Sequence, residues 1–342
     1  MKEINWGIIG LGNVALKFAE GFKFSNISKL KGIASKDQEK LKQFQNTFQV
    51  EKEYCFNEYE ELLKSNEIDI IYIALPNSLH HEWIIKCIKN NKKILVEKPS
   101  TLNFSEIKDI KENFDVNNIF FAEGFMYRFH PQIYKIIEIL NKKIIGELIS
   151  MKTYFGNNIL SKKFFFGFKK KKKIDPTNRL YSKKLGGGAI LDLGCYPISL
   201  SVFIASLISE VKFNEFQILE KKKELGVTGV DIDSYAKIVF KNGFVSYIGA
   251  SFVKNLENKT EITGENGKLI IDNVWSGMPG KIKIIKKDNI EEISIKDSKN
   301  IYSYEINSLS KNILENKKKP DFPGVTFEDS LINMAIIDEW LK

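Results

Sequence analysis

The alternation of short apolar runs with helix-like stretches over the first 125 residues or so is the feature that most limits the folds open to this chain. The apolar runs lie at residues 4–9, 30–34, 68–75, 93–96 and 119–122, and the helical stretches lie at 13–23, 37–48, 79–90 and 104–114. The run at 68–75 is nearly all apolar, which is typical of a central strand buried on both faces. Strands that alternate with helices form crossover units, so this part is predicted to be an α/β, doubly wound parallel sheet.

The pattern changes after about residue 125. Residues 148–155 alternate like a half-exposed strand, and residues 190–208 are long, apolar and helical. Between apolar runs, Asn242-Gly243 favours a hairpin turn because both residues tolerate positive φ. The second part is therefore predicted to be α+β with a mostly antiparallel sheet.

Two amphipathic helices, at residues 302–314 and 327–341, end the chain. A length of 342 residues fits two domains of ordinary size. We predict a dinucleotide-binding domain at 1–125 and a substrate-binding and oligomerisation domain at 126–342, with the last helices able to pack back on the first domain.

The charge of the chain is carried by lysine. The net charge is +9, and only two of the 52 basic residues, Arg128 and Arg179, are arginines. Nucleic-acid binders usually exploit arginine forks, so lysines spread along the whole chain indicate solvated surfaces and no nucleic-acid partner. The dense run at 169–173 is interpreted as a solvated loop, with steering of an anionic substrate as the alternative.

The cysteines and the hydropathy bear on the compartment. Cys55, Cys87 and Cys195 are few and far apart, which is typical neither of a disulfide framework nor of a zinc site. No run of about 18 apolar residues is expected to span a membrane, and the first residues enter a strand without a signal segment. We therefore expect a cytoplasmic protein without a membrane partner.

A glycine-rich turn, Gly10-Leu11-Gly12-Asn13-Val14-Ala15, follows the first strand and opens a helix. Glycines there allow a tight turn and let backbone N–H groups approach a pyrophosphate at the helix N-terminus. The turn predicts dinucleotide binding, with Gly10, Gly12, Asn13 and Val14 as cofactor contacts. An ordinary strand-to-helix turn is the alternative.

The end of the second strand bears on the choice of cofactor. A site for NAD usually has a carboxylate about 20 residues after the glycines, to accept from the ribose hydroxyls. Ser35 stands at that position here, followed by Lys36 and, four residues on, Lys40. A hydroxyl and two ammonium groups suit a 2′-phosphate, so NADP(H) is favoured and NAD(H) stays possible. Asp37 argues the other way, and a solvated helix start is the alternative.

Glu97-Lys98-Pro99 follows the strand predicted at residues 93–96. The carboxyl ends of parallel strands face the ligand crevice. A lysine beside a glutamate there can donate or accept a proton once partial burial lowers its pKa. The alternative is a surface tripeptide without a role.

Three glycines, 186–188, precede a helical stretch with Asp192 and Tyr196 four residues apart on one face. The glycines permit close approach of another backbone or a ligand. A charge in so apolar a helix is costly unless it has a partner or a function. Asp192 is either a functional group or a carboxylate that accepts from the first N–H groups of the helix.

Taken in order, the segments at residues 10–15, 74–80, 97–99, 123–131 and 186–197 resemble the Gfo/Idh/MocA oxidoreductase family. That family includes glucose–fructose oxidoreductase and inositol dehydrogenase. The branch with NADP-linked xylose dehydrogenase and dihydrodiol dehydrogenase is the most similar. The resemblance implies a Rossmann domain plus an open-faced sheet domain, and a homo-oligomer, dimer or tetramer, formed through that sheet.

The resemblance also implies roles for residues. Lys98 matches the family's catalytic lysine, and Asp192 matches the aspartate of the second-domain helix. Tyr196 stands where many members have histidine, and the dihydrodiol and xylose branch has tyrosine there as a proposed general acid. Whether Lys98 or Tyr196 carries the proton stays open.

Further contacts follow from the same resemblance. The strand end with Leu75, Pro76 and Asn77, the next helix start with His80, and Glu97 with Lys98 match cofactor-contacting positions. A metal site at His80-His81 is not expected, because no cysteine or carboxylate cluster accompanies it.

Both arginines fall inside these segments or beside them. Arginine retained in a lysine-rich chain indicates a need for its planar fork. Tyr127, Arg128 and Arg179 are therefore candidate substrate-binding residues, with structural pairing to a carboxylate as the alternative for the arginines.

The expected function is an NAD(P)-dependent oxidoreductase that transfers a hydride between nicotinamide and a carbinol or carbonyl carbon of a sugar or cyclic polyol. An enzyme of the same fold acting on a nucleotide sugar and a non-catalytic dinucleotide sensor are the alternatives.

Overall fold

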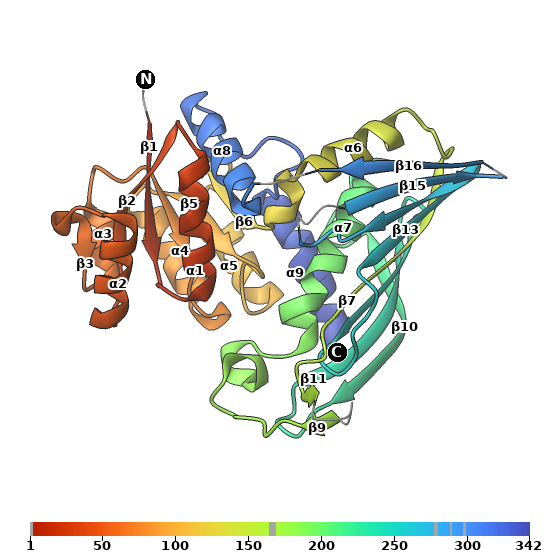
Figure 1. Cartoon of the computed structure of the whole chain (residues 1–342), viewed down its shortest axis with the longest axis horizontal. Coiled ribbons are helices and arrows are strands. Elements are labelled where there is room, and N and C mark those ends of the chain that lie inside the picture. Colours follow the sequence, from red (N-terminus) through yellow and green to blue (C-terminus); the bar gives the residue numbers. More distant parts are fainter. Residues whose placement is uncertain (1–2, 164–168, 277–279, 288, 297–298) are drawn as a thin grey trace. The chain divides into compact units, whose positions relative to one another are not determined.

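The computed structural model describes residues 3–163, 169–276, 280–287, 289–296 and 299–342, which fold into two compact units (Figure 1). Unit 1 consists of Met1–His130 and Ser298–Ser330, and unit 2 of Pro131–Asp297 and Leu331–Lys342.

The sheet of unit 1 is six-stranded and parallel, in the order β3-β2-β1-β4-β5-β6. Its strands are β1 (Ile4–Ile9), β2 (Ser28–Ala34), β3 (Cys55–Phe56), β4 (Ile70–Ile73), β5 (Lys93–Glu97) and β6 (Phe121–Gly124). The doubly wound parallel sheet is thus confirmed. Strand order reverses between β1 and β4, and ligands of such sheets bind beyond the carboxyl ends of the strands at that point.

The helices of unit 1 lie on both faces of this sheet (Figure 1). They are α1 (Asn13–Glu20), α2 (Gln38–Phe48), α3 (Tyr59–Lys64), α4 (His80–Lys89), α5 (Phe104–Asn113) and α8 (Ile301–Leu314), with 3-10 turns at Gly21–Phe24, Lys52–Tyr54, Asn77–Leu79, Val116–Asn118 and Met126–Phe129. Helix α8 packs against α1 and β1 although nearly the whole of unit 2 separates them in the sequence. In the hydrophobic core that these elements share, the rings of Phe18 and Tyr72 stack with their centroids 4.0 Å apart.

Two elements of unit 1 were not predicted. Strand β3 has two residues and helix α3 has six, which is too short for either hydrophobic period to show. The helix expected at 13–23 ends at Glu20 and continues as a 3-10 turn, and the strand expected at 68–75 is confined to Ile70–Ile73.

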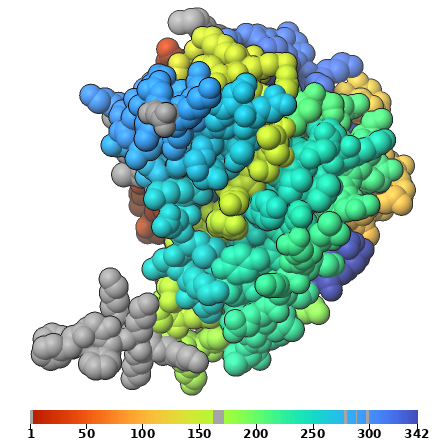
Figure 2. Space-filling model, turned by 90° about the vertical axis from the view of Figure 1, so that its right-hand side faces the viewer, coloured from red at the N-terminus to blue at the C-terminus, as the bar shows by residue number. Residues whose placement is uncertain are grey.

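The sheet of unit 2 is eight-stranded, in the order β10-β11-β12-β7-β13-β14-β15-β16. Its strands are β7 (Leu148–Gly156), β10 (Phe216–Leu225), β11 (Asp231–Phe240), β12 (Val245–Ser251), β13 (Lys259–Gly264), β14 (Gly267–Asp272), β15 (Gly280–Lys286) and β16 (Asn289–Ile295). Its strand pairs are antiparallel except β12 with β7, so the mostly antiparallel sheet is confirmed. Figure 2 looks onto this sheet, with β7 in yellow-green between teal strands.

The hairpin between β11 and β12 is confirmed, with Gly243 at φ 88°. Asn242 contributes through its side chain, which accepts from the N–H of Phe244 and donates to the carbonyl of Ala205. The lysine run at 169–173 was interpreted as a loop, and this is wrong for its first three residues. Strand β9 (Lys169–Lys171) pairs with β8 (Ser161–Lys163), whereas residues 164–168 lie outside the described residues.

The helices of unit 2 include α6 (Pro131–Asn141), α7 (Cys195–Ser206) and, from Leu331 on, α9 (Phe327–Leu341). The unit also has 3-10 turns at Arg179–Tyr181 and Lys183–Leu185 and a π-helical turn at Ile190–Gly194. Contrary to the sequence-based expectation, the segment Lys183–Ser206 is long and apolar enough to cross a membrane, with a mean hydropathy of 1.6. Because 94% of its apolar window is buried inside the protein, it is placed as a core helix of this unit.

Candidate functional site

The turn between β1 and α1 contains two glycines with different constraints. Gly10 has φ 86°, and a Cβ there would lie 2.6 Å from the carbonyl oxygen of Ala74. The chain's own packing therefore demands glycine at this position. Gly12, by contrast, is the N-cap of α1 with φ −90°, and a Cβ there would meet nothing within 4 Å.

The start of α1 is suited to an anion. The helix has no side-chain cap and no acidic residue in its first turn, and its first intrahelical bond shown at this end is from Leu16 N–H to Gly12. The N–H groups of Asn13 and Val14 come before that bond in the first turn, where a helix has no intrahelical acceptor for them. Unsatisfied N–H groups and the helix dipole favour a phosphate there, so these residues fit a dinucleotide pyrophosphate.

The end of β2 is organised by Asp37. Its Oδ1 accepts from the N–H groups of Glu39 and Lys40, each at 3.1 Å, and so caps α2. These hydrogen bonds, first that from the Lys40 backbone, lower the pKa of Asp37. Ser35 is buried and accepts from the Asp37 N–H at 3.1 Å. The aspartate that argued for NAD is thus committed to its own helix.

The two lysines of this segment are only loosely held. Lys40 Nζ lies 3.5 Å from Asp37, and Lys36 Nζ lies 3.9 Å from Glu58. Their side chains are 54% and 68% exposed. Exposed pairs of this kind contribute about 0–1 kcal/mol each, so both ammonium groups remain able to bind another anion.

The segment after β4 is tied to the segment after β5 by His80. Its ring is fully buried, with Nε2 2.8 Å from the carbonyl oxygen of Leu75 and Nδ1 2.9 Å from that of Pro99. In the sequence between Leu75 and His80 lie Pro76, the N-cap of a 3-10 turn, and Asn77, which is buried. Since its two ring nitrogens meet backbone carbonyls of different segments, His80 links the loop after β4 to the loop after β5.

Glu97 ends β5 and is anchored inside unit 1. Its Oε1 accepts from the hydroxyl of Tyr72, whose pKa is raised well above its usual value by burial and then by the Glu97 charge. Glu305 on α8 is buried too, and burial together with Glu97 raises its pKa well above the ordinary value. Glu97 is therefore held in place by Tyr72 at the end of β5, and Lys98, half-buried, follows it directly.

The glycine triplet of unit 2 is explained by an aspartate that the sequence analysis missed. Gly188 has φ 115°, and a Cβ there would lie 2.3 Å from Asp231 Oδ1. Asp231 Oδ2 accepts from the N–H of Ile190 at 2.8 Å, and burial raises the pKa of this carboxyl. Asp231, 41 residues further on, therefore takes the helix-start contact considered for Asp192.

Asp192 lies in the π-helical turn, and turns of this kind are frequent at functional sites. Its Oδ1 accepts from Arg179 Nη1 at 3.2 Å, and its side chain is 15% exposed.

Tyr196 lies in the first turn of α7 against an aromatic wall. Its ring makes edge contacts with Phe155 at 5.2 Å and Trp275 at 5.8 Å. Trp275 is held by a hydrogen bond from Nε1 to the carbonyl of Tyr154, 3.2 Å long. Trp275 lies in a turn after β14, where no hydrophobic period of the sequence points to it.

Tyr127 and Arg128 lie in the interior of unit 1. Tyr127 is fully buried, and Arg128 is 3% exposed with Nε donating to the carbonyl of Pro323 at 2.8 Å. Both residues are thus packed inside unit 1, and the partner of Arg128 shown here is a backbone carbonyl rather than a carboxylate.

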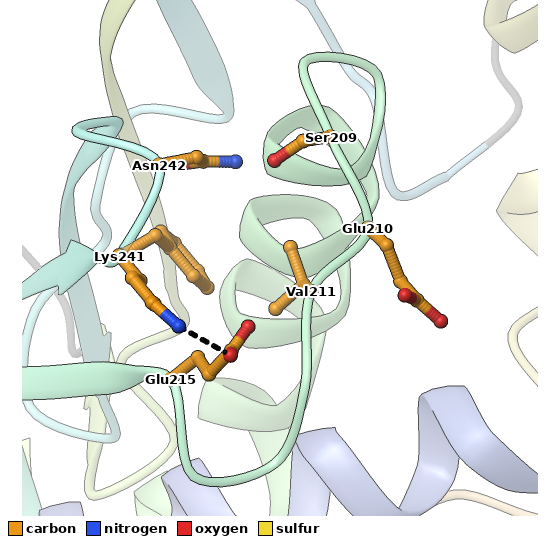
Figure 3. Close-up of a pocket in the computed structure, with 7 residues that line it drawn as sticks. Ser209, Glu210, Val211, Glu215, Lys241 and Asn242 are labelled. Atoms are coloured by element: carbon orange, nitrogen blue, oxygen red, sulfur yellow. Dashed lines mark hydrogen bonds and ion pairs between the residues drawn. The ribbon is translucent and has the colours of Figure 1, made fainter.

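A surface cavity of about 320 Å³ in unit 2 is lined by none of the predicted site residues (Figure 3). Lys241 and Glu215 form an ion pair of 2.8 Å across it. Among the described residues, no group of three or more histidine, cysteine or acidic side chains is arranged to hold a metal ion.

Comparison with known proteins agrees with this geometry. Residues 4–125 match the model of the "oxidoreductase family, NAD-binding Rossmann fold", and residues 133–270 match the GFO/IDH/MocA C-terminal domain. Trans-1,2-dihydrobenzene-1,2-diol dehydrogenase of Xenopus tropicalis is 26% identical over 98% of this chain and 97% of its own length.

Two solved structures share the fold. A 3-ketoreductase from Actinomadura kijaniata, in complex with NADP and TDP-benzene, has 22% identity and a TM-score of 0.80, covering 98% of this chain and 96% of the other. The aldose–aldose oxidoreductase of Caulobacter crescentus, complexed with glycerol, has 18% identity and a TM-score of 0.84, covering 99% and 96%. With family models matched in both units, this chain belongs to the Gfo/Idh/MocA family of oxidoreductases.

Proposed function

We propose that this protein is an NADP(H)-dependent dehydrogenase or reductase of a sugar or cyclic polyol. The bound nicotinamide supplies hydride transfer to or from a carbinol or carbonyl carbon, and the chain's own side chains bind, orient and move the proton. The observation that carries the cofactor choice is the state of Asp37, whose two carboxylate oxygens face its own helix start and Lys40.

Because Asp37 caps its own helix, the preference for NADP(H) rests on the other polar side chains at the end of β2. Lys36 and Lys40 are exposed cations with weak partners, and Ser35 offers a hydroxyl beside them. A 2′-phosphate carries the charge that such a group attracts, whereas the 2′-hydroxyl of NAD does not.

Titration of NADPH and NADH by fluorescence tests this preference. Lys36→Ala and Lys40→Ala are expected to weaken NADPH binding about 10- to 100-fold each, on the scale of one charge-assisted hydrogen bond, and to leave NADH within twofold. Lys42→Ala removes an exposed cation from the same helix and is the matched control. Tighter binding of NADH than NADPH by the unmodified protein would overturn the assignment.

For the proton, two side chains qualify. Lys98 follows the fixed carboxylate of Glu97 at a strand end, and Tyr196 is held by aromatic neighbours at a helix start. Either can exchange a proton with the substrate hydroxyl, and Asp192 would orient or electrostatically support that group.

The nucleotide-sugar alternative is kept because of the relatives. A dTDP-3,4-didehydro-2,6-dideoxy-α-D-glucose 3-reductase of Actinomadura kijaniata is 23% identical over 98% of this chain and 94% of its own length. A panel of aldoses, polyols and nucleotide sugars, read by NADPH fluorescence, separates the two classes. A non-catalytic sensor would bind cofactor and turn over none of them, and the joint presence of Lys98, Asp192 and Tyr196 argues against it.

We also propose that the sheet of unit 2 joins copies of this chain and that the protein is cytoplasmic. The rings of Tyr154 on β7 and Tyr235 on β11 lie 6.2 Å apart across Gly249 of β12, and the half-buried Tyr247 lies on the same strand β12. Light scattering of the unmodified protein and of Tyr235→Glu tests the interface, and the variant is expected to be monomeric. Cys55, Cys87 and Cys195 are free thiols, as a reducing compartment keeps them.

A further inference from the structure

Arg179 is an arginine that packing does not explain. The chain has 50 lysines and two arginines, and the other arginine, Arg128, is buried on the carbonyl of Pro323. Arg179 is 49% exposed and makes one hydrogen bond, to Asp192 Oδ1 at 3.2 Å. Its remaining N–H groups have no protein partner within the part of the chain that the structure describes.

The backbone around Arg179 is built to hold it in place. The 3-10 turn Arg179–Tyr181 begins at Asn178, whose side chain accepts from the N–H of Leu180. Behind this turn runs the glycine triplet: a Cβ on Gly187 would lie 2.6 Å from the carbonyl oxygen of Arg179, and the Gly188 N–H donates to Leu180 at 3.0 Å. Glycine is therefore required for the turn to approach this closely.

The same triplet fixes the other partner. Gly188 is pressed against Asp231, which in turn accepts from the N–H of Ile190 at the start of the segment that carries Asp192. Both ends of the Arg179–Asp192 pair are thus set by one run of backbone. A pair whose groups are ordered in advance loses little conformational entropy when it forms, and a planar guanidinium fixes a carboxylate oxygen in direction as well as distance.

We propose that Arg179 is a positioning residue for Asp192, which keeps this carboxylate ionised and fixes its orientation. One N–H of the guanidinium engages Oδ1. The inference rests on the proposed function only for what Asp192 then does in the reaction. A lysine at 179 would keep the charge and lose the direction, because an ammonium is a point charge on a flexible stem.

The first test needs no substrate. Full-length protein labelled with [4-¹³C]aspartate is titrated by NMR, and the Asp192 carboxyl signal is assigned by its absence in Asp192→Asn. In Arg179→Gln, the pKa of Asp192 is expected to rise by about 1 unit, the low end of the effect of an adjacent opposite charge, because the arginine is half exposed. Lys183→Gln, which removes an exposed cation from the next turn, is the control and should leave the signal in place.

The second test uses whichever sugar, polyol or nucleotide sugar of the panel is turned over with NADPH or NADP⁺. Arg179→Gln is expected to lower kcat about 10- to 100-fold with KM unchanged within threefold, to shift the acidic limb of the pH profile upward, and to recover in part with added guanidinium. Arg179→Lys should restore the ionisation of Asp192 but not the full rate.

The outcomes separate the two proposals. An unchanged Asp192 pKa in Arg179→Gln overturns the positioning role whatever the activity. A rise in KM confined to phosphorylated or carboxylated substrates, with kcat unchanged, overturns it in favour of direct substrate binding. A panel without any turnover, together with the expected NMR shift, leaves the positioning of Asp192 standing and rejects the proposed function.

Discussion

Two glycines separated by one residue are expected to respond in opposite ways to substitution. Gly10→Ala puts a Cβ at φ 86°, 2.6 Å from the carbonyl oxygen of Ala74. The left-handed conformation costs about 1–2 kcal/mol, and crowding in a packed interior typically costs about 1–3 kcal/mol. The free energy of unfolding should therefore fall by about 2–5 kcal/mol, a large share of the roughly 5–15 kcal/mol usual for a folded domain.

Gly12→Ser is expected to leave stability unchanged or slightly raised. Gly12 has φ −90° and ψ −173°, which any residue adopts, and nothing lies within 4 Å of an added Cβ. Serine is also a better N-cap than glycine. The new side chain nevertheless occupies the space that we assign to the pyrophosphate, so NADPH affinity should fall about 10- to 100-fold, on the scale of one or two charge-assisted hydrogen bonds.

Urea unfolding of the cofactor-free protein and a fluorescence titration with NADPH measure both quantities on each variant. The reasoning is refuted if Gly12→Ser binds NADPH within threefold of the unmodified protein, or if Gly10→Ala unfolds at an unchanged urea concentration. The first result would mean that the open space beside α1 is not where the phosphates lie, and the second that the turn relaxes without loss.

Three further predictions concern the proton, the second unit and pH. Lys98→Met, or its matched variant Tyr196→Phe, should lower turnover about 10²- to 10⁴-fold with little change in cofactor affinity, and near-normal rates in both would show that neither carries the proton. Asp231→Asn should destabilise unit 2 in urea unfolding, because Asp231 Oδ2 accepts from Ile190 N–H. Asp192→Asn should unfold like the unmodified protein and lose turnover. If instead Asp192→Asn is destabilised and Asp231→Asn loses only turnover, the two roles are exchanged. The raised pKa of Glu305 means that the native state keeps a proton which the unfolded state releases near pH 4.5. The contribution of Glu305 to the free energy of unfolding is therefore full below that pH and is lost as the pH rises toward the native pKa. Glu305→Gln should therefore increase the free energy of unfolding more at pH 8 than at pH 4.5, and an equal effect at both would contradict the buried, protonated state.

The sequence by itself determined the features that depend on patterns among residues close together in the chain. The alternation of strands and helices predicted the parallel sheet, and the glycines at 10 and 12 predicted a tight strand-to-helix turn. The Asn242-Gly243 pair predicted its hairpin. Each of these features depends on residues within a few positions of one another, because periodicity and turn conformation are local properties.

The remainder depended on contacts between distant residues. The sequence did not show that Asp37 caps its own helix, where it accepts from two N–H groups at 3.1 Å each. Asp231, which explains the glycine triplet, is brought there by the register of β11 in the sheet of unit 2. The aromatic neighbours of Tyr196 come from β7 and from the segment after β14. Charge and hydropathy specify that a side chain needs a partner or a dry surrounding, but only the packing of the sheets decides which of many equivalent residues provides it.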